Sequence, residues 1–262
     1  MLKVLLTIDV EVWCDSWDDL ETQFNAAFRQ YVYGPTGQGH CALPLKLKIL
    51  CDHGLKGNFF VESLFSARFG LSPLQEIVGL IQEQNQEIQL HLHTEWVDEA
   101  VESILPNAFV KRQHLKYFPL EEQVALIGKG AELLVRAGVK EIVAFRAGNF
   151  GINRDTVKAL RRHRIPIDSS YNPTMHTDMG EITPGYVLLQ PANIEGVFEY
   201  PLTVFLPAFG RVGHAQLGAC SRPELISILW QALERGWDSV VLLSHNFECM
   251  NQLKTALDPI VM

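Results

Sequence analysis

Short apolar runs of strand length alternate with longer patterns of helical period along most of this 262-residue chain. The runs that predict strands cover residues 3–8, 57–61, 87–92, 142–145, 165–168 and 239–243. The patterns that predict helices cover residues 43–53, 74–84, 120–137, 154–163 and 222–235. Nearly continuous apolar strands that alternate with helices are typical of a parallel sheet covered on both faces. This many units favours an α/β fold with a closed or nearly closed barrel.

One region breaks this alternation. Residues 172–216 are rich in proline and glycine and hold strand-like pieces at 186–190 and 198–204. We interpret the region as loops and strands that decorate one barrel. No stretch rich in Ser, Gly or Pro marks a linker, and no repeat of fixed period is present. The sequence therefore predicts a single domain over residues 1–262.

The net charge of the chain limits the classes of partner that it can be expected to bind. Twenty-two Lys and Arg against 30 Asp and Glu give a formal net charge of -8. Binding to nucleic acid or to an anionic membrane surface needs a basic face, so neither partner is expected. No run approaches the roughly 18 apolar residues of an integral membrane segment. The five cysteines form no Cys-x-x-Cys pair, and the start of the chain is too quickly acidic for a signal peptide, so we expect a cytoplasmic protein.

Chemically active side chains cluster where the predicted strands end. They are Asp9, Glu11, His91, His93, Glu95, Arg146, Asp168 and His245. In a parallel α/β barrel the carboxyl-terminal ends of the strands share one face, and enzymes of this architecture place their chemistry there. The amino-terminal ends of the same strands carry no comparable set. We therefore predict an active site at this face.

The residue types in this set are typical of a metal site. Carboxylates together with imidazoles suit Zn²⁺, and Co²⁺ or Ni²⁺ are also acceptable. Asp9 and Glu11 are two residues apart, so both project to the same side of an extended strand. His91 and His93 share a strand face in the same way, whereas Glu95 could reach the site only if the strand has ended. One carboxylate could hold the metal while the other takes a proton.

With these residues in place, the chain resembles the polysaccharide deacetylase family, also called the NodB-homology or carbohydrate esterase family 4 group. The family's paired carboxylates match Thr7-Ile-Asp9-Val-Glu11, and its histidine motif matches the segment from His91 to Glu95. Its arginine motif matches Phe145-Arg146-Ala-Gly-Asn149. Its last two motifs match Asp168-Ser-Ser170 and Leu243-Ser-His245. The resemblance implies an irregular (β/α)7-type barrel and runs from residue 2 to about residue 250.

The resemblance also implies roles for these residues. Asp9 would be the general base, Arg146 would orient it, and His245 would be the catalytic acid. Glu11 and His91 would hold a divalent metal, most simply Zn²⁺, with Co²⁺, Ni²⁺ or Mn²⁺ as alternatives. The family's second histidine is replaced by Glu95, which leaves the third ligand between Glu95 and His93, with a slight preference for Glu95.

The function implied is metal-dependent removal of an N-acetyl group from an amino sugar or glycan. The motifs most resemble deacetylase-like proteins of bacterial O-antigen and surface-polysaccharide synthesis. We expect Asn149, Asp168 and Trp96 to contact the substrate, with Trp96, Trp13 and Trp17 forming an apolar platform for a sugar ring. Two other functions stay open: hydrolysis of an amide or imide that is not a sugar, and sugar binding without catalysis. The sugar, its carrier and the oligomeric state also stay open.

Overall fold

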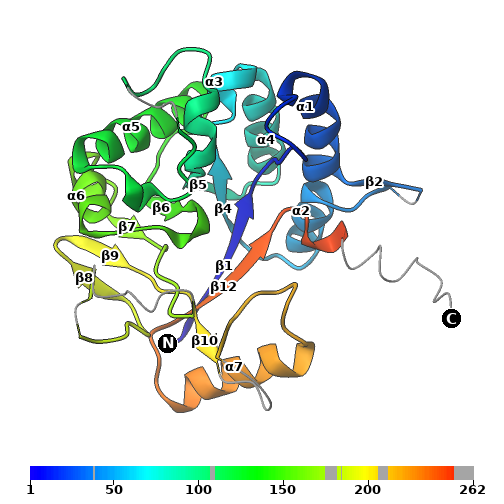
Figure 1. Ribbon diagram of the computed structural model, residues 1–262. Helices are drawn as coiled ribbons and strands as arrows, with labels where there is room; N and C mark the ends of the chain where they lie inside the picture. The colour runs from blue at the N-terminus through cyan, green and yellow to red at the C-terminus, as the bar shows by residue number, and fades with distance from the viewer. Residues whose placement is uncertain (38, 107–109, 175–181, 184, 206–211, 251–262) are drawn as a thin grey trace, which may run out of the picture.

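The computed structural model describes the chain except for residues 38, 107–109, 175–181, 184, 206–211 and 251–262. Its centre is an eight-stranded sheet in the order β12-β1-β4-β5-β6-β7-β9-β8, which curls into part of a barrel (Figure 1). The strands are β1 (Lys3–Val10), β4 (Asn58–Glu62), β5 (Glu87–Leu92), β6 (Ala144–Ala147), β7 (Ile167–Asp168), β8 (Ala192–Ile194), β9 (Val197–Glu199) and β12 (Ser239–His245). All neighbouring strands pair in parallel except β8 and β9. The predicted α/β barrel class is confirmed.

Helices cover the outer face of the sheet. They are α1 (Leu20–Phe28), the π-helical turn η1 (Arg29–Tyr33), α2 (Leu43–Asp52), α3 (Ser66–Phe69), α4 (Ser72–Glu83), α5 (Leu120–Ala137), α6 (Arg154–Arg162) and α7 (Arg222–Glu234). Among the described residues there are also three 3₁₀ turns. Turn η2 (Thr94–Glu99) follows β5, η3 (Leu115–Tyr117) precedes α5, and η4 (Gly148–Phe150) follows β6. Two small hairpins join β2 (Pro35–Thr36) to β3 (Gly39–His40) and β10 (Val204–Phe205) to β11 (Gly213–His214). Within the described residues, no helix combines the length and the apolar character needed to cross a membrane.

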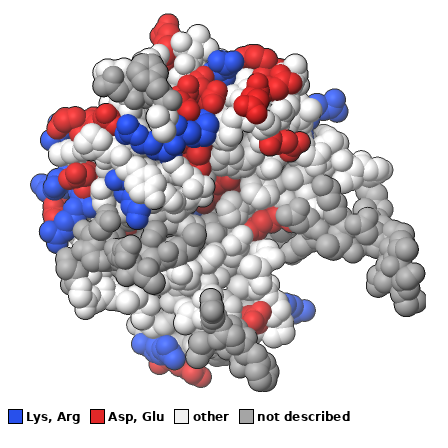
Figure 2. All heavy atoms as spheres, viewed as in Figure 1, with Lys and Arg blue, Asp and Glu red and all other residues white. Residues whose placement is uncertain are grey.

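The outer surface of the helices carries mixed charge. Over α5 and α6, positive and negative side chains lie next to one another (Figure 2). Arg162 pairs with Glu121 at 2.7 Å, and Lys158 pairs with Asp155 at 2.8 Å. These are exposed pairs that contribute little to stability, but they leave no uniform basic surface on this side.

The two faces of the sheet differ in chemistry because successive residues of a strand point to opposite sides. Ile8 and Val10 of β1 belong to the main hydrophobic core between sheet and helices. Thr7 and Asp9 of the same strand contact Arg146 of β6 on the inner side. The interior of the curled sheet is therefore polar where β1 and β6 end.

The register of the sheet brings the predicted site residues to the same end of the sheet. Asp9 is opposite His245 on β12, and His91 is opposite Arg146 on β6. Because these strands are parallel, the loops that follow them leave the sheet at the same edge. This edge is the mouth of the curled sheet, and we use that name for it below.

Most predicted elements are present with shifted boundaries, and two differences have clear causes. Residues 186–190 form no strand: the backbone N–H of Leu188 donates to the Tyr171 hydroxyl, and the Gln190 side chain accepts from the backbone of Ser239. The predicted strand at 198–204 is divided in two, and Pro201, which lacks a backbone N–H, lies between the parts. Helix α1 is absent from the predicted elements, although its buried residues recur every four positions at Leu20, Phe24 and Phe28.

Candidate active site

Glu11, His91 and His93 form a compact cluster at the mouth of the sheet. Oε1 of Glu11 lies 3.1 Å from Nε2 of His91 and 3.1 Å from Nε2 of His93. All three side chains are buried, and one potential ligand atom from each lies within 4.8 Å of the others. A carboxylate and two imidazoles are the donor set that a borderline divalent cation prefers. The cluster is therefore a candidate metal centre.

The cluster carries charge despite its burial. Burial alone would raise the pKa of Glu11, but the charge of His93 and hydrogen bonds from both imidazoles hold it well below its ordinary value. Burial would likewise lower the pKa of His93, yet the Glu11 charge and hydrogen bonds to Glu11 and Glu95 raise it to about 10. Without a metal, the site is an ion pair in which a proton occupies the place of a cation.

Neighbouring groups orient each imidazole. Nδ1 of His91 lies 2.8 Å from the backbone carbonyl oxygen of Arg146. That oxygen can only accept a hydrogen bond, so Nδ1 is the donor and Nε2 is the nitrogen directed at the cluster. Nδ1 of His93 lies 3.3 Å from Oε2 of Glu95. Oε1 of Glu95 in turn accepts from the Asn149 amide at 2.9 Å. These partners fix which ring nitrogen points into the site.

The structure therefore places Glu95 behind His93 and not beside Glu11. Residue 93 is still extended, with φ -101° and ψ 109°, so His91 and His93 project to the same side and both reach Glu11. The turn η2 begins only at Thr94 and carries Glu95 to the back of the His93 ring. The geometry does not support the slight preference for Glu95 as third ligand, because the strand ends one residue too late.

Arg146 and Asp9 form a fully buried pair next to the cluster. Nη1 of Arg146 donates to Oδ1 of Asp9 at 2.7 Å and to the Thr7 hydroxyl at 3.0 Å. Its other nitrogens donate to the backbone oxygen and hydroxyl of Ser169, and its guanidinium lies 4.5 Å from the ring centre of Phe60. Because these four hydrogen bonds fix the guanidinium, Arg146 keeps the Asp9 carboxylate in one orientation.

His245 approaches the cluster from β12, on the other side of Asp9. Asp9, Glu11 and His245 each offer a potential ligand atom within 4.8 Å of the others. Nδ1 of His245 lies 3.2 Å from Oε1 of Glu248, which also accepts from the Gln216 amide at 2.6 Å. Burial would lower the pKa of His245, but the bond to Glu248 and the charges of Asp9 and Glu11 raise it. A raised pKa suits a histidine that donates a proton.

Asp168 ends strand β7, and its register partner on β6 is Phe145. Asp168 is also opposite Glu199 on the neighbouring strand β9, and both side chains are buried. Burial raises the pKa of Asp168 to about 6, and burial together with the Asp168 charge raises the pKa of Glu199 well above its ordinary value. The Asp168 carboxylate accepts from the Ser170 hydroxyl. With 0% of its surface exposed, Asp168 cannot touch a substrate, so that prediction is corrected.

The predicted aromatic platform is also corrected in part. Trp96 has 0% of its surface exposed, and its ring packs against Trp17, Phe65 and Phe69. It supports the site from behind and offers no face to a ligand. Trp13 is half-buried at the mouth: its indole N–H donates to Oε2 of Glu11 at 2.7 Å, and its ring lies 4.6 Å from that of His93.

The third predicted substrate contact, Asn149, lies half-buried beside Glu95. Its backbone is left-handed, with φ 51°, a conformation that asparagine tolerates better than most residues. Its amide is already used by Glu95, so the structure gives it a supporting place in the metal centre.

Two buried glutamates near the site are not among the residues predicted from the sequence. Glu248 follows His245 by three residues, a spacing that could have identified it as a partner. Glu62 ends β4 and accepts from the backbone N–H groups of Leu64 and Phe65 at 2.7 and 3.1 Å. Burial raises the pKa of Glu62 to about 7. No pattern in the sequence separates Glu62 from a surface glutamate, because its role depends on the turn that follows it.

Comparison with known proteins identifies the fold. No protein-family model and no curated protein sequence matches the chain. Among solved structures, a candidate polysaccharide deacetylase from Mycobacterium smegmatis aligns with a TM-score of 0.54 and 20% identity, over 98% of this chain and 85% of that one. The resemblance to polysaccharide deacetylases is thereby confirmed at the level of the fold.

A second likeness limits what the fold can say. A 4-α-glucanotransferase from Thermococcus litoralis aligns with a TM-score of 0.57 and 10% identity, over 100% of this chain but only 37% of that one. Because two proteins with different stated activities share the architecture, the reaction has to be argued from the side chains of the site.

Proposed function

We propose that this protein is a metal-dependent hydrolase that removes an N-acetyl group from an amino sugar. The observation that carries the proposal is the convergence of Glu11, His91 and His93 next to the Asp9–Arg146 pair. A metal-binding cluster, a fixed carboxylate and a histidine with a raised pKa are the parts that hydrolysis of an unreactive amide requires.

The donor set fits a divalent cation. Glu11, His91 and His93 would hold it, Glu95 would support His93, and Zn²⁺ is the first candidate, followed by Co²⁺, Ni²⁺ and Mn²⁺. A cation in such a site lowers the pKa of water and polarises a carbonyl oxygen. Before it binds, His93 has to release the proton that Glu11 stabilises, so binding should weaken as the pH falls.

Asp9 is assigned as the general base. Its Oδ1 is held by Arg146, which leaves Oδ2 to take a proton from an attacking water. Because the guanidinium fixes the direction of the carboxylate, the free oxygen keeps one orientation toward the mouth. Arg146 therefore acts as a positioning residue, because it is fully buried behind Asp9 and has no surface for a substrate.

His245 is assigned as the general acid. Its Nδ1 is occupied by Glu248, so Nε2 is the atom that would protonate the leaving amine. Protonation is required because an amine is too basic to leave as an anion. The charges of Asp9, Glu11 and Glu248 all favour the protonated imidazole.

The substrate class rests on the motifs and on the likeness in fold. We assign the sugar to the mouth of the sheet, where the half-buried Trp13 replaces Trp96 as the aromatic contact. A role in bacterial surface-polysaccharide or O-antigen synthesis follows from the motifs alone. A cytoplasmic location is supported by the five scattered cysteines, which contain no Cys-x-x-Cys pair.

The geometry of the site weakens the reason for considering sugar binding without catalysis. That alternative was motivated by Glu95 at the position of a ligand histidine, and His93 supplies the missing imidazole from two residues earlier. The alternative of an amide or imide that is not a sugar stays as an outcome of the test.

The decisive experiment measures metal content and acetate release on the same preparation. The purified protein should bind close to one equivalent of metal and release acetate from N-acetylated oligosaccharides, and a chelator should abolish the release. Asp9→Asn should retain the metal and lose turnover. Turnover of a cyclic imide without acetate release would replace the proposed substrate class, and metal binding with neither reaction would refute the proposed hydrolysis.

A further inference from the structure

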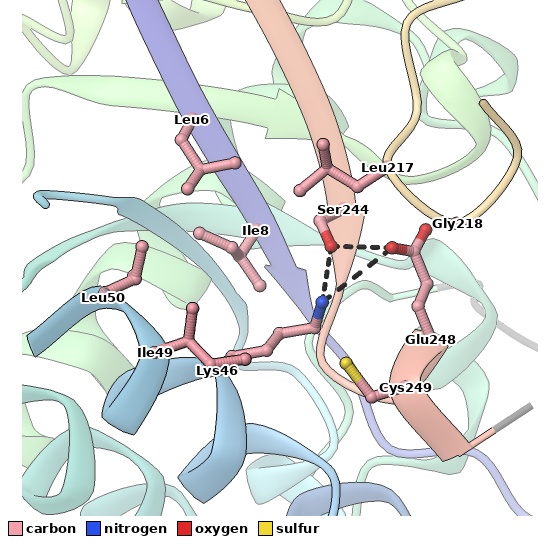
Figure 3. Close-up of a pocket in the computed structure, with 10 residues that line it drawn as sticks. All are labelled: Leu6, Ile8, Lys46, Ile49, Leu50, Leu217, Gly218, Ser244, Glu248 and Cys249. Atoms are coloured by element: carbon pink, nitrogen blue, oxygen red, sulfur yellow. Dashed lines mark hydrogen bonds and ion pairs between the residues drawn. The ribbon is translucent and has the colours of Figure 1, made fainter. Parts of the chain in front are cut away.

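Lys46 lies on α2, outside the sheet, yet its ammonium group reaches the end of β12. Nζ donates to the Ser244 hydroxyl at 2.6 Å and lies 3.9 Å from Oε2 of Glu248. Only 10% of the Lys46 side chain is exposed. Figure 3 shows Nζ pointing between Ser244 and Glu248. Holding a long charged side chain in one buried place costs side-chain entropy and desolvation, which calls for a compensating role.

Glu248 connects the two faces of β12. Ser244 and His245 are adjacent in the strand and therefore project to opposite sides of the sheet. Ser244 donates to Oε2 of Glu248 at 2.6 Å on the outer side, and Nδ1 of His245 lies 3.2 Å from Oε1 on the side of the mouth. Glu248 can touch both because it lies just past the end of the strand, where the sheet no longer separates the faces.

All the donors in this chain of contacts converge on the Glu248 carboxylate. Lys46 donates to Ser244, Ser244 donates to Oε2, and Gln216 donates to Oε1. Burial would raise the pKa of Glu248, but these donors, together with His245 and the Lys46 charge, lower it to about 2. An ionised carboxylate accepts only, so Nδ1 of His245 must carry the proton that joins them.

The surroundings of Lys46 strengthen its effect on Glu248. Next to them is a cavity of about 190 Å³ lined on its other sides by apolar residues (Figure 3): Leu6, Ile8, Ile49, Leu50 and Leu217. Charges interact more strongly beside apolar walls than in water. Among the residues that the structure describes, Lys46 is the one cationic side chain that lines this cavity.

We propose that Lys46 and Ser244 are positioning residues for the general acid: from the outer face of the sheet they hold Glu248 against Nδ1 of His245. This inference rests on the proposed function for its catalytic meaning, but the arrangement can be tested without turnover. Lys46 touches none of Glu11, His91 or His93, so its loss should leave metal binding unchanged.

The test uses Lys46→Met, which keeps most of the side-chain length and removes the charge, with Lys48→Met as the matched control. Lys48 lies on the same helix and pairs with Asp52, but 68% of its side chain is exposed. The first readout is the downfield proton signal of the His245 Nδ1–H in protein labelled with ¹⁵N-histidine, assigned by its absence in His245→Gln. We expect the signal in wild type and Lys48→Met, and its loss or a clear upfield shift in Lys46→Met.

The second readout is kinetic. In an active preparation Lys46→Met should lower kcat about 10- to 100-fold, the scale of losing a supporting partner, with little change in KM or metal affinity. Ser244→Ala, which removes only the bridging hydroxyl, should act in the same direction and covers the case in which Lys46→Met fails to fold.

The outcomes separate the two proposals. If the His245 signal is altered in Lys46→Met but the wild-type protein releases no acetate, the positioning role is retained and the proposed hydrolase is refuted. An unchanged signal in both Lys46→Met and Ser244→Ala would overturn the positioning role even if the enzyme is active. An altered signal with unchanged kcat would overturn its link to catalysis.

Discussion

Two groups of buried carboxylates lie in the same sheet, and the protein shifts their pKa values in opposite directions. At the mouth, Glu11 has a lowered pKa because two imidazoles face it. On the neighbouring strands β7 and β9, Asp168 and Glu199 lie opposite each other, and burial raises the pKa of both. Burial is nearly the same in the two places, so the partners decide the charge.

The difference bears on the proposed reaction. Under the proposed function, the cluster at the mouth would exchange the proton of His93 for a metal cation. The raised pKa values of Asp168 and Glu199 favour their protonated forms, which limits the anionic charge near Arg146. Arg146 interacts with both groups. It binds Asp9, and its charge offsets part of the rise in the pKa values of Asp168 and Glu199 that burial causes.

The largest expected effect comes from removing that shared cation. Arg146→Met leaves Asp9 buried without a partner, and the loss of one member of such a pair costs about 3–5 kcal/mol of the free energy of unfolding. Turnover should also fall, because Asp9 is no longer fixed. Denaturant unfolding measures the first effect. A stability within 1 kcal/mol of wild type, as an approximate limit, would mean that the pair is not the connection between the two groups.

The next effect separates the ligand from its support. His93→Ala should lose metal affinity by far more than 100-fold, whereas Glu95→Ala should lose about 10- to 100-fold, because Glu95 only orients the His93 ring. Glu95→Gln, which keeps an oxygen toward Nδ1, is the matched control and should lie closer to wild type. Competition with a coloured chelator measures all three. A larger loss in Glu95→Ala than in His93→Ala would reverse the assignment.

A third effect tests the Asp168–Glu199 pair through pH. Its raised pKa values mean that the folded protein holds a proton that the unfolded chain releases, so the pair's contribution to stability is present at low pH and is lost as the pH rises from about 4 through about 6. Glu199→Gln removes the part of this dependence that belongs to Glu199. The free energy of unfolding of wild type minus that of the variant should therefore fall by about 1 kcal/mol or more between pH 4 and 7.

The exposed Glu121→Gln is the control for this measurement, and its difference from wild type should stay flat. The cluster at the mouth has the opposite sign, because the lowered pKa of Glu11 gives stability that is lost as the pH falls. If the difference in free energy of unfolding between wild type and Glu199→Gln rises with pH, Asp168 and Glu199 are ionised in the folded protein as Glu11 is.

The smallest effect concerns Asn149. Asn149→Gly keeps the left-handed backbone accessible and removes the bond to Glu95, which is worth about 0.5–1.5 kcal/mol. Because Asn149 acts on the metal centre through both Glu95 and His93, metal affinity should fall less than in Glu95→Ala. An equal or larger fall would place Asn149 in direct contact with the ligand sphere.

Much of this arrangement could be predicted because it depends on period and position. Apolar runs and helical patterns located β1, β5, α5 and β12. The ends of parallel strands must share an edge, so Asp9, His91, Arg146 and His245 could be placed near one another from the sequence.

The sequence alone determined which side chains are available at the mouth, and these are carboxylates and imidazoles, the types that the proposed metal site needs. Only the tertiary structure decided their order. The backbone at residue 93 stays extended for one residue more than the motif suggested, which exchanges the places of His93 and Glu95. Contacts such as Lys46 to Ser244, 198 residues apart, are absent from any local pattern. The reason is that a side chain's charge and partners depend on which strands and helices pack around it, whereas period and propensity describe only its neighbours along the chain.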